Sequence, residues 1–169
     1  MKKALWLVLS LSTFSSWGGV SLNVKGNIYF LPCDVSTDTK YQEVNFGSLP
    51  NIDFQTAGNA SEWKTFNLNV ENCPAGTTKA MVKFDGVTDS DDATHFANMA
   101  ASDAAQNIAL QITNADHSTT YKNQDQMTIA INSSTGMGVF PLAARLYSTQ
   151  GSATVGNFES VVQLTFTYQ

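Results

Sequence analysis

Apolar and polar residues alternate along the first part of this chain, from residue 19 to residue 31. The apolar row contains Val20, Leu22, Val24 and Ile28, with Gly26 in the same row. The intervening positions are polar: Ser21, Asn23, Lys25 and Asn27. A period of two places successive side chains on opposite faces of an extended strand, so the pattern predicts a β-strand.

The rest of the chain repeats this pattern in short runs separated by loops rich in Gly, Ser, Asn, Asp and Thr. The runs lie at residues 65–71, 80–84, 108–113, 127–131, 139–147 and 162–169. The last run has the apolar row Val162, Leu164, Phe166 and Tyr168. Residues 96–105 are apolar without alternation and are expected to hold at most a helical turn. The patterning therefore predicts an all-β domain.

Spaced strands in one domain are typical of an immunoglobulin-like β-sandwich. In this chain both ends of the domain carry an amphipathic strand, whereas sandwiches normally protect their edges. The strand at residues 19–31 either folds into its own sandwich or pairs with a neighbouring molecule, and the pattern alone allows both.

Residues 1–18 have the features of a signal peptide. Lys2 and Lys3 precede an apolar run at residues 4–11, and Ser16-Trp17-Gly18 supplies small residues before the expected cleavage after Gly18. The alternative, a membrane anchor, is disfavoured because the apolar run is too short to span a bilayer. The mature chain of about 150 residues is then the size of one domain.

The mature chain is acidic. Without Lys2 and Lys3 it has seven basic and fourteen acidic residues, a formal net charge of −7. An acidic chain with scattered lysines has no electrostatic footprint for nucleic acid.

The two cysteines, Cys33 and Cys73, both follow the signal peptide. An even count in an exported chain favours one disulfide, which would close a loop of about 40 residues and contribute roughly 4 kcal/mol. Two free thiols or a metal pair are the alternatives. The absence of a Cys-x-x-Cys motif disfavours a metal pair, since only His95 and His117 remain to complete such a site.

No pattern in the sequence indicates catalysis. Both histidines are expected in exposed loops, and no Gly-x-Ser-x-Gly nucleophile elbow or phosphate-binding glycine loop occurs. The acidic stretch at residues 85–92 lacks the spacing and terminal Glu of a calcium-binding EF-hand loop. We therefore expect no enzyme activity, no metal site and no cofactor.

Several short motifs together resemble the pilins of chaperone–usher fimbriae, over residues 19–169. They are the N-terminal strand with its glycine, Pro32-Cys33, Glu71-Asn72-Cys73-Pro74, Ala105-Gln106-Asn107-Ile108, Phe140-Pro141-Leu142 with Arg145, Gly156 at the fourteenth position from the end, and the penultimate Tyr168. No single motif is specific, but their order and spacing are those of this family. The chain looks most similar to the minor, tip-adaptor subunits of type 1 fimbriae.

The resemblance implies an incomplete immunoglobulin-like sandwich that lacks its final strand, with an N-terminal donor-strand extension. In that family the gap is a hydrophobic groove, which a periplasmic chaperone fills first and the extension of the next subunit fills at the outer-membrane usher. By this resemblance Val20, Leu22, Val24, Gly26 and Ile28 form the donor strand. The acceptor-groove and chaperone-binding strand contains Val162, Leu164, Phe166 and Tyr168. The Cys33–Cys73 bond would form before the chaperone accepts the subunit.

The implied organisation is a signal peptide at 1–18, a donor-strand extension at 19–31 and a pilin domain at 32–169. The implied function is a structural subunit that polymerises by donor-strand exchange, contributes to cell adhesion and is exported through the periplasm to the cell surface. A short stretch before the first cysteine favours a tip adaptor. The alternatives are a major rod pilin of the same pathway and a stand-alone secreted sandwich that binds a carbohydrate or receptor.

Overall fold

The structure is a computed structural model that describes residues 21–28 and 31–169 of the chain. Residues Leu31–Gln169 form one compact unit. Residues 21–28 are therefore described by themselves.

The compact unit consists almost entirely of strands, which confirms the prediction of an all-β domain. The elements, in chain order, are β1 (Asp34–Val35), α1 (Thr37–Lys40), the 3₁₀ helix η1 (Asn51–Phe54), β2 (Lys64–Glu71), β3 (Lys79–Gly86), β4 (Ile108–Asn114), β5 (Thr120–Tyr121), β6 (Gln126–Ala130), β7 (Gly138–Ser148) and β8 (Val162–Tyr168). The long strands coincide with the six alternating runs of the sequence to within a residue or two.

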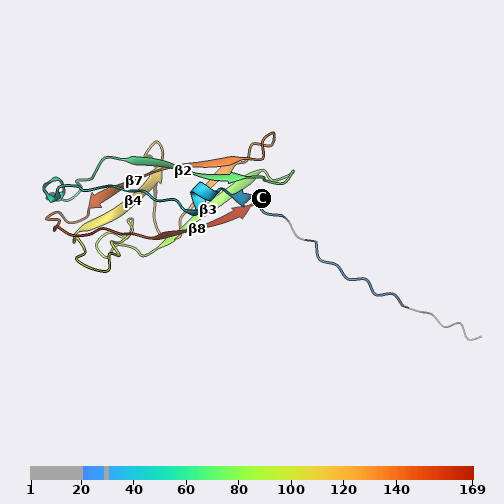
Figure 1. Cartoon of the computed structure of the whole chain (residues 1–169), viewed down its shortest axis with the longest axis horizontal. Helices are drawn as coiled ribbons and strands as arrows, with labels where there is room; N and C mark the ends of the chain where they lie inside the picture. The colour runs from blue at the N-terminus through green and yellow to red at the C-terminus, as the bar shows by residue number, and fades with distance from the viewer. Residues whose placement is uncertain (1–20, 29–30) are drawn as a thin grey trace, which may run out of the picture. The chain divides into compact units, whose positions relative to one another are not determined.

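The strands form two antiparallel sheets. The larger sheet has the order β1-β2-β7-β4-β5, and the smaller sheet has the order β6-β3-β8. Figure 1 shows β2, β7 and β4 in one layer and β3 with β8 in the other. This is the two-layer arrangement of an immunoglobulin-like sandwich.

The core lies between the two sheets, where the apolar row of each strand faces inward. Its largest fully buried side chains are Leu68, Val70, Val82, Phe84, Phe96, Phe140 and Leu142. They come from both sheets and from the loop before β4, so each strand contributes the face that alternation assigns to the interior.

The apolar residues 96–105 do not form the expected helical turn. Phe96 exchanges backbone hydrogen bonds with Leu110 of β4, and the amide of Ala97 donates to Val87. Phe96 is fully buried and pairs with β4 at this one point, and residues 101–103 form bends. Burial of one large ring and pairing with a neighbouring strand decide the conformation here, not local helix propensity.

Residues 21–28 form no strand, although their alternation is the clearest in the chain. A strand is defined by hydrogen bonds to a partner, and no partner is paired with these residues. The strand prediction is therefore not met in the single chain. No helix in the described residues is long and apolar enough to cross a membrane.

Candidate functional site

Strand β8 lies at an open edge of the smaller sheet. It pairs with β3 along its whole length, from Val162 opposite Gly86 to Tyr168 opposite Ala80. In the described chain no strand pairs with its other edge. Such an edge presents a row of backbone N–H and C=O groups that can pair with another strand.

A second segment without strand partners, residues 42–49, faces β8 from the other side of a gap. It has no regular secondary structure, and the amide of Gly47 is satisfied by the side chain of Asn45 at 2.7 Å instead of by a neighbouring strand. Within residues 43–49 no backbone group bonds to another backbone group of the described chain. Both walls of the gap therefore offer unpaired backbone.

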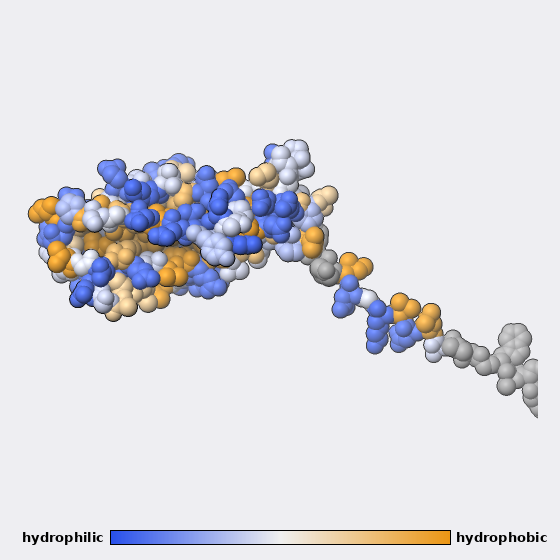
Figure 2. All heavy atoms as spheres, in the orientation of Figure 1, coloured by the Kyte–Doolittle hydropathy of each residue, from blue (hydrophilic) through white to orange (hydrophobic). Residues whose placement is uncertain are grey.

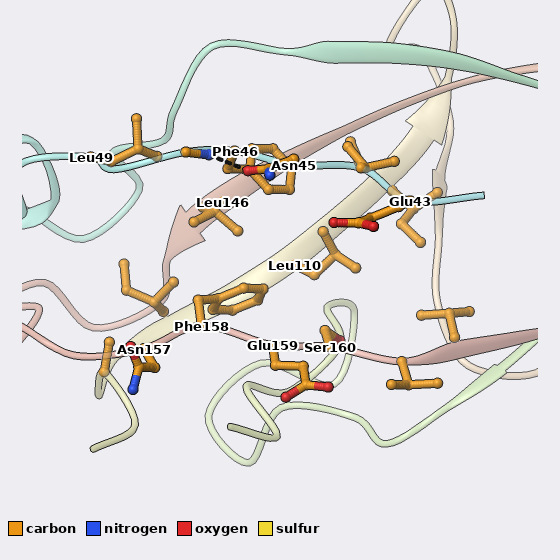
Figure 3. Close-up of a pocket in the computed structure, with 18 of the residues that line it drawn as sticks. Glu43, Asn45, Phe46, Leu49, Leu110, Leu146, Asn157, Phe158, Glu159 and Ser160 are labelled. Carbon is orange, nitrogen blue, oxygen red and sulfur yellow. Dashed lines mark hydrogen bonds between the residues drawn. The ribbon is translucent and has the colours of Figure 1, made fainter. Parts of the chain in front are cut away.

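The gap is an open groove with a volume of about 870 Å³. Figure 3 shows Phe46 and Leu49 on one wall, Asn157, Phe158 and Ser160 on the opposite wall, and Leu110 and Leu146 between them. Apolar core side chains complete the floor: Phe66, Phe84, Ile112, Leu142, Ala144 and Leu164. In Figure 2 apolar residues form a band along this face of the domain between hydrophilic residues. The sandwich is thus incomplete where one further strand would cover its core.

The groove involves only part of the predicted acceptor strand. Val162 and Leu164 line it. Phe166 and Tyr168 are half-buried and pack against the core, but they do not line the groove. Burial, together with the nearby carboxylate of Asp34, raises the pKa of the Tyr168 phenol.

Gly156 lies in the groove wall at a position that only glycine fits. Its φ of +155° is a backbone conformation that L side chains rarely adopt. A Cβ atom added there would collide with the backbone of Asp103, Ala104 and Ala105. The amide of Asn157 donates to the carbonyl of Asp103 at 2.7 Å, so this close approach of two backbone segments shapes the end of the groove.

The apolar row of residues 21–28 is exposed. The exposed fractions of Leu22, Val24 and Ile28 are 86%, 80% and 104%. Gly26 has open space around its α-carbon. Val20, the first member of the predicted donor strand, lies outside the described residues. Contiguous exposed apolar side chains are typical of interaction sites.

Comparison with known proteins gives the family. The family described as "Fimbrial: Fimbrial protein" matches residues 22–169, which is most of the chain. This chain belongs to the fimbrial protein family.

Relatives that match over nearly the full length of the chain support the same family. The chain is 32% identical to Protein FimG of Escherichia coli K12 over 162 residues, covering 96% of this chain and 92% of that one. It is 28% identical to the type-1 fimbrial protein subunit of Serratia marcescens over the whole of both chains. The P pilus rod subunit PapA has the same fold, with a TM-score of 0.68 at 18% identity over 82% of this chain and 100% of that one. The fold is therefore the immunoglobulin-like pilin fold, and the chain is a structural fimbrial subunit of the chaperone–usher class.

The pilin domain contains the predicted disulfide, Cys33–Cys73. It joins the residue before β1 to the loop after β2, and the two strands pair with each other through Asp34 and Glu71. The bond therefore fixes the first residues of the domain to the larger sheet.

His95 does not lie in an exposed loop, and that expectation was wrong. Its side chain is buried and stacks on Tyr147, with ring centroids 4.5 Å apart. Nδ1 lies 2.8 Å from Asp92, and Nε2 has no hydrogen-bond partner in the described chain. Burial lowers the pKa of His95, and the Asp92 carboxylate opposes this effect. His117 is exposed, as expected, and stacks on Trp63.

The acidic loop uses its carboxylates for its own backbone. Asp89 accepts hydrogen bonds from the amides of Asp91 and Asp92, and Asp92 accepts from both the amide and the hydroxyl of Thr94. These bonds account for the Asx-type turns of the loop.

The wall formed by residues 42–49 was not predicted from the sequence. A short alternation was present, because Val44 and Phe46 are half-buried while Glu43 and Asn45 are exposed. Two apolar residues in a polar stretch were too few to predict a strand-like segment. The signal was therefore present but weak.

Proposed function

We propose that this fimbrial subunit assembles by donor-strand exchange, in which residues 19–31 of one subunit enter the groove of the next. The observation that carries the proposal is that a groove open to an additional strand and an exposed, alternating apolar segment occur in one chain. The donor residues are Val20, Leu22, Val24 and Ile28, whose side chains enter the groove, and Gly26.

Burial of the donor row supplies the driving force. Four aliphatic side chains at about 1.5–3 kcal/mol each contribute on the order of 6–12 kcal/mol before the entropy of ordering the strand is subtracted. The open edge of β8 adds backbone hydrogen bonds, which also fix the register. Gly26 lets the donor backbone approach the floor of the groove without a side chain in between.

In the acceptor we assign direct contact with the donor strand to Val162 and Leu164. Phe166 and Tyr168 continue the same strand, and we propose that they pair with a chaperone before assembly. Gly156 shapes the end of the groove.

We further propose the route of the chain to the cell surface. Residues 1–18 act as a signal peptide, residues 19–31 as the donor-strand extension and residues 32–169 as the pilin domain. A periplasmic chaperone covers the groove until an outer-membrane usher delivers the next subunit. We assign the subunit no catalytic role.

Within the fimbria we propose the position of a tip adaptor. The support is the short stretch of 19–32 before Cys33, since rod subunits of the family usually have a longer one. Gold labelling of an epitope-tagged subunit tests this position. Label confined to the fibre tip is expected, and label along the whole rod would exclude the adaptor role.

Deletion of residues 19–30 tests donor-strand exchange. The truncated subunit should still be recovered with its chaperone but should no longer be the donor in a fimbria. If the extension were instead a strand of its own sandwich, the same deletion would unfold the domain, and neither the chaperone complex nor the native disulfide would be recovered.

A further inference from the structure

Five side chains from four parts of the chain form a stack on the larger sheet. The ring of His117 lies 4.2 Å from the ring of Trp63, measured between centroids. The guanidinium carbon of Arg145 lies 4.3 Å from the ring centroid of Trp63 and 5.7 Å from that of Tyr147. His95 stacks on Tyr147 at the other end. The contacts therefore link these residues in the order His117, Trp63, Arg145, Tyr147 and His95.

This stack lies on the face of the larger sheet that is turned away from the groove. Leu146 of β7 lines the groove. Successive side chains of a strand point to opposite faces, so those of Arg145 and Tyr147 lie on the outer face. None of the five residues of the stack lines the groove. A strand bound in the groove therefore leaves the stack uncovered.

Arg145, the only arginine of the chain, is fixed in orientation but has no anionic partner. Its Nε donates a hydrogen bond to Oε1 of Gln111 at 2.6 Å, and the rings of Trp63 and Tyr147 flank its guanidinium. The described residues include all fourteen acidic residues of the chain, yet none of them forms an ion pair with Arg145. Within the same residues its terminal nitrogens have no hydrogen-bond acceptor. A guanidinium held in this way is preorganised for a bidentate contact with a carboxylate.

Acidic side chains at both ends of the stack limit the charge of a ligand. Asp92 lies 2.8 Å from Nδ1 of His95, and Asp116 directly precedes His117 in the chain. These carboxylates would repel a ligand with several negative charges spread along the stack. One carboxylate on an otherwise neutral molecule reaches Arg145 in the middle of the stack without that repulsion. The charges therefore favour a singly charged ligand over a polyanion.

The groups beside Arg145 are neutral and capable of hydrogen bonding. Gln111 lies directly opposite Arg145 in the β4–β7 pair, and its amide donates to the hydroxyl of Thr120. All three residues are half-buried. Amide and hydroxyl groups next to a cation suit a ligand that carries several hydroxyl groups. An extended peptide would need a free strand edge, whereas β7 lies between β2 and β4. A saccharide therefore fits this face better than a peptide strand.

We propose that this face binds a saccharide that carries a single carboxylate, such as a uronic acid residue. The carboxylate contacts the terminal N–H groups of Arg145, and ring hydroxyls contact Gln111 and Thr120. Trp63 and Tyr147 act as positioning residues that hold the guanidinium in place. The site does not depend on strand exchange, and it adds binding of an acidic glycan at the side of the fibre to the structural role of the subunit.

Titration of the oxidised mature chain with a matched pair of sugars tests the site. Methyl glucuronide and methyl glucoside differ only in that the first has a carboxylate where the second has a hydroxymethyl group. Trp63 is the only tryptophan after residue 18, so its fluorescence reports binding at Arg145. The glucuronide should change this fluorescence saturably, and the glucoside should bind about tenfold more weakly.

Two substitutions at Arg145 separate its charge from its geometry. Arg145→Lys keeps the charge but loses the bidentate contact, so the affinity for the glucuronide should fall about tenfold. Arg145→Gln should abolish the preference for the glucuronide over the glucoside. Lys79→Gln, at an exposed lysine of β3 in the other sheet, makes the same change in net charge and should bind like the wild type.

A substitution at Tyr147 tests the positioning role. Tyr147→Leu should lower the affinity for the glucuronide and leave the affinity for the glucoside unchanged, which a general loss of structure would not do. Recovery of the native disulfide and of the β-sheet circular dichroism in every variant shows that a loss of binding is not a loss of folding.

Three results would overturn the proposal. Equal affinity for the two sugars, or an Arg145→Lys variant that binds the glucuronide like the wild type, would exclude a carboxylate contact at Arg145. A folded wild-type chain without a saturable response to the glucuronide would exclude the site. A tetraglutamate peptide that binds more tightly than the glucuronide would exclude the assignment to a saccharide. None of these results bears on strand exchange, which the deletion of residues 19–30 tests separately.

Discussion

Leu164 lies directly opposite Phe84 in the β3–β8 pair, and both side chains line the open groove. The edge strand and its inner neighbour thus share one apolar surface, in which Phe84 is fully buried and Leu164 is half-buried at the groove. Replacing Leu164 with Asn should leave the sheet paired but weaken binding of a donor strand by about 2 kcal/mol, or roughly thirtyfold.

The matched control for this change is the next residue. Thr165→Asn lies on the exposed face of β8 and should bind the donor strand like the wild type. Binding is measured by the rate at which a labelled donor strand is released from the assembled subunit. Equal release rates for the two variants would show that the groove floor at Leu164 does not hold the donor.

Gly156→Ala should destabilise the domain strongly. A Cβ at this position meets the backbone of Asp103 and Ala105, which are not free to move like the end of a flexible side chain. The positive φ adds strain of about 1–3 kcal/mol. Gly76 has a φ of +99° with nothing within 4 Å, so Gly76→Ala isolates the strain from the collision. Thermal unfolding should show a larger loss for Gly156→Ala, and a smaller or equal loss would contradict the close approach.

Removal of the disulfide should lower stability through the unfolded state. Cys33 and Cys73 are separated by 40 residues. Replacing both with Ser gives the unfolded chain more conformational entropy, which should lower the free energy of unfolding by about 4 kcal/mol. The expected result is a lower midpoint of denaturant unfolding with the groove unchanged. A midpoint equal to that of the oxidised wild type would show that the pairing of β1 with β2 alone holds the start of the domain.

The domain should lose stability in mildly acidic solution because of His95. Burial holds the folded-state pKa of this imidazole below its ordinary value of 6.5. Above pH 6.5 both folded and unfolded chains are neutral at this position, so the stability is fully present. As the pH falls through 6.5, the unfolded chain takes up the proton first, and stability is lost until the folded pKa is also passed.

His95→Gln tests the assignment, because glutamine does not titrate. The melting temperature of the wild type should fall between pH 7.5 and pH 5.5, and that of His95→Gln should fall less. An equal fall in both proteins would assign the effect to other groups.

The sequence was sufficient to predict the strands and the disulfide, and it failed where long-range packing decides the structure. Alternation identified the long strands, and in β2 and β8 the apolar row faces the interior while the other row is more exposed. His95 was misplaced because its burial depends on Tyr147, which is 52 residues away in the sequence and reaches it only in the folded sandwich.

The N-terminal extension shows a related limit of prediction from sequence. Its alternation predicts a strand, and the single chain contains no partner for it, so the residues stay unpaired. A pattern of this kind reports what a segment can bind, whereas the folded domain reports where a strand is missing. The proposed strand exchange connects the unpaired segment with the missing strand.

Photo-crosslinking from the donor row tests that connection most directly. A benzophenone amino acid replaces Leu22, fimbriae are irradiated, and the crosslinked peptides are identified by mass spectrometry with isotopically labelled and unlabelled subunits mixed. Donor-strand exchange predicts crosslinks from position 22 to residues 42–49 or 158–164 of a different subunit. Crosslinks confined to the same chain, or to surfaces outside the groove, would contradict it.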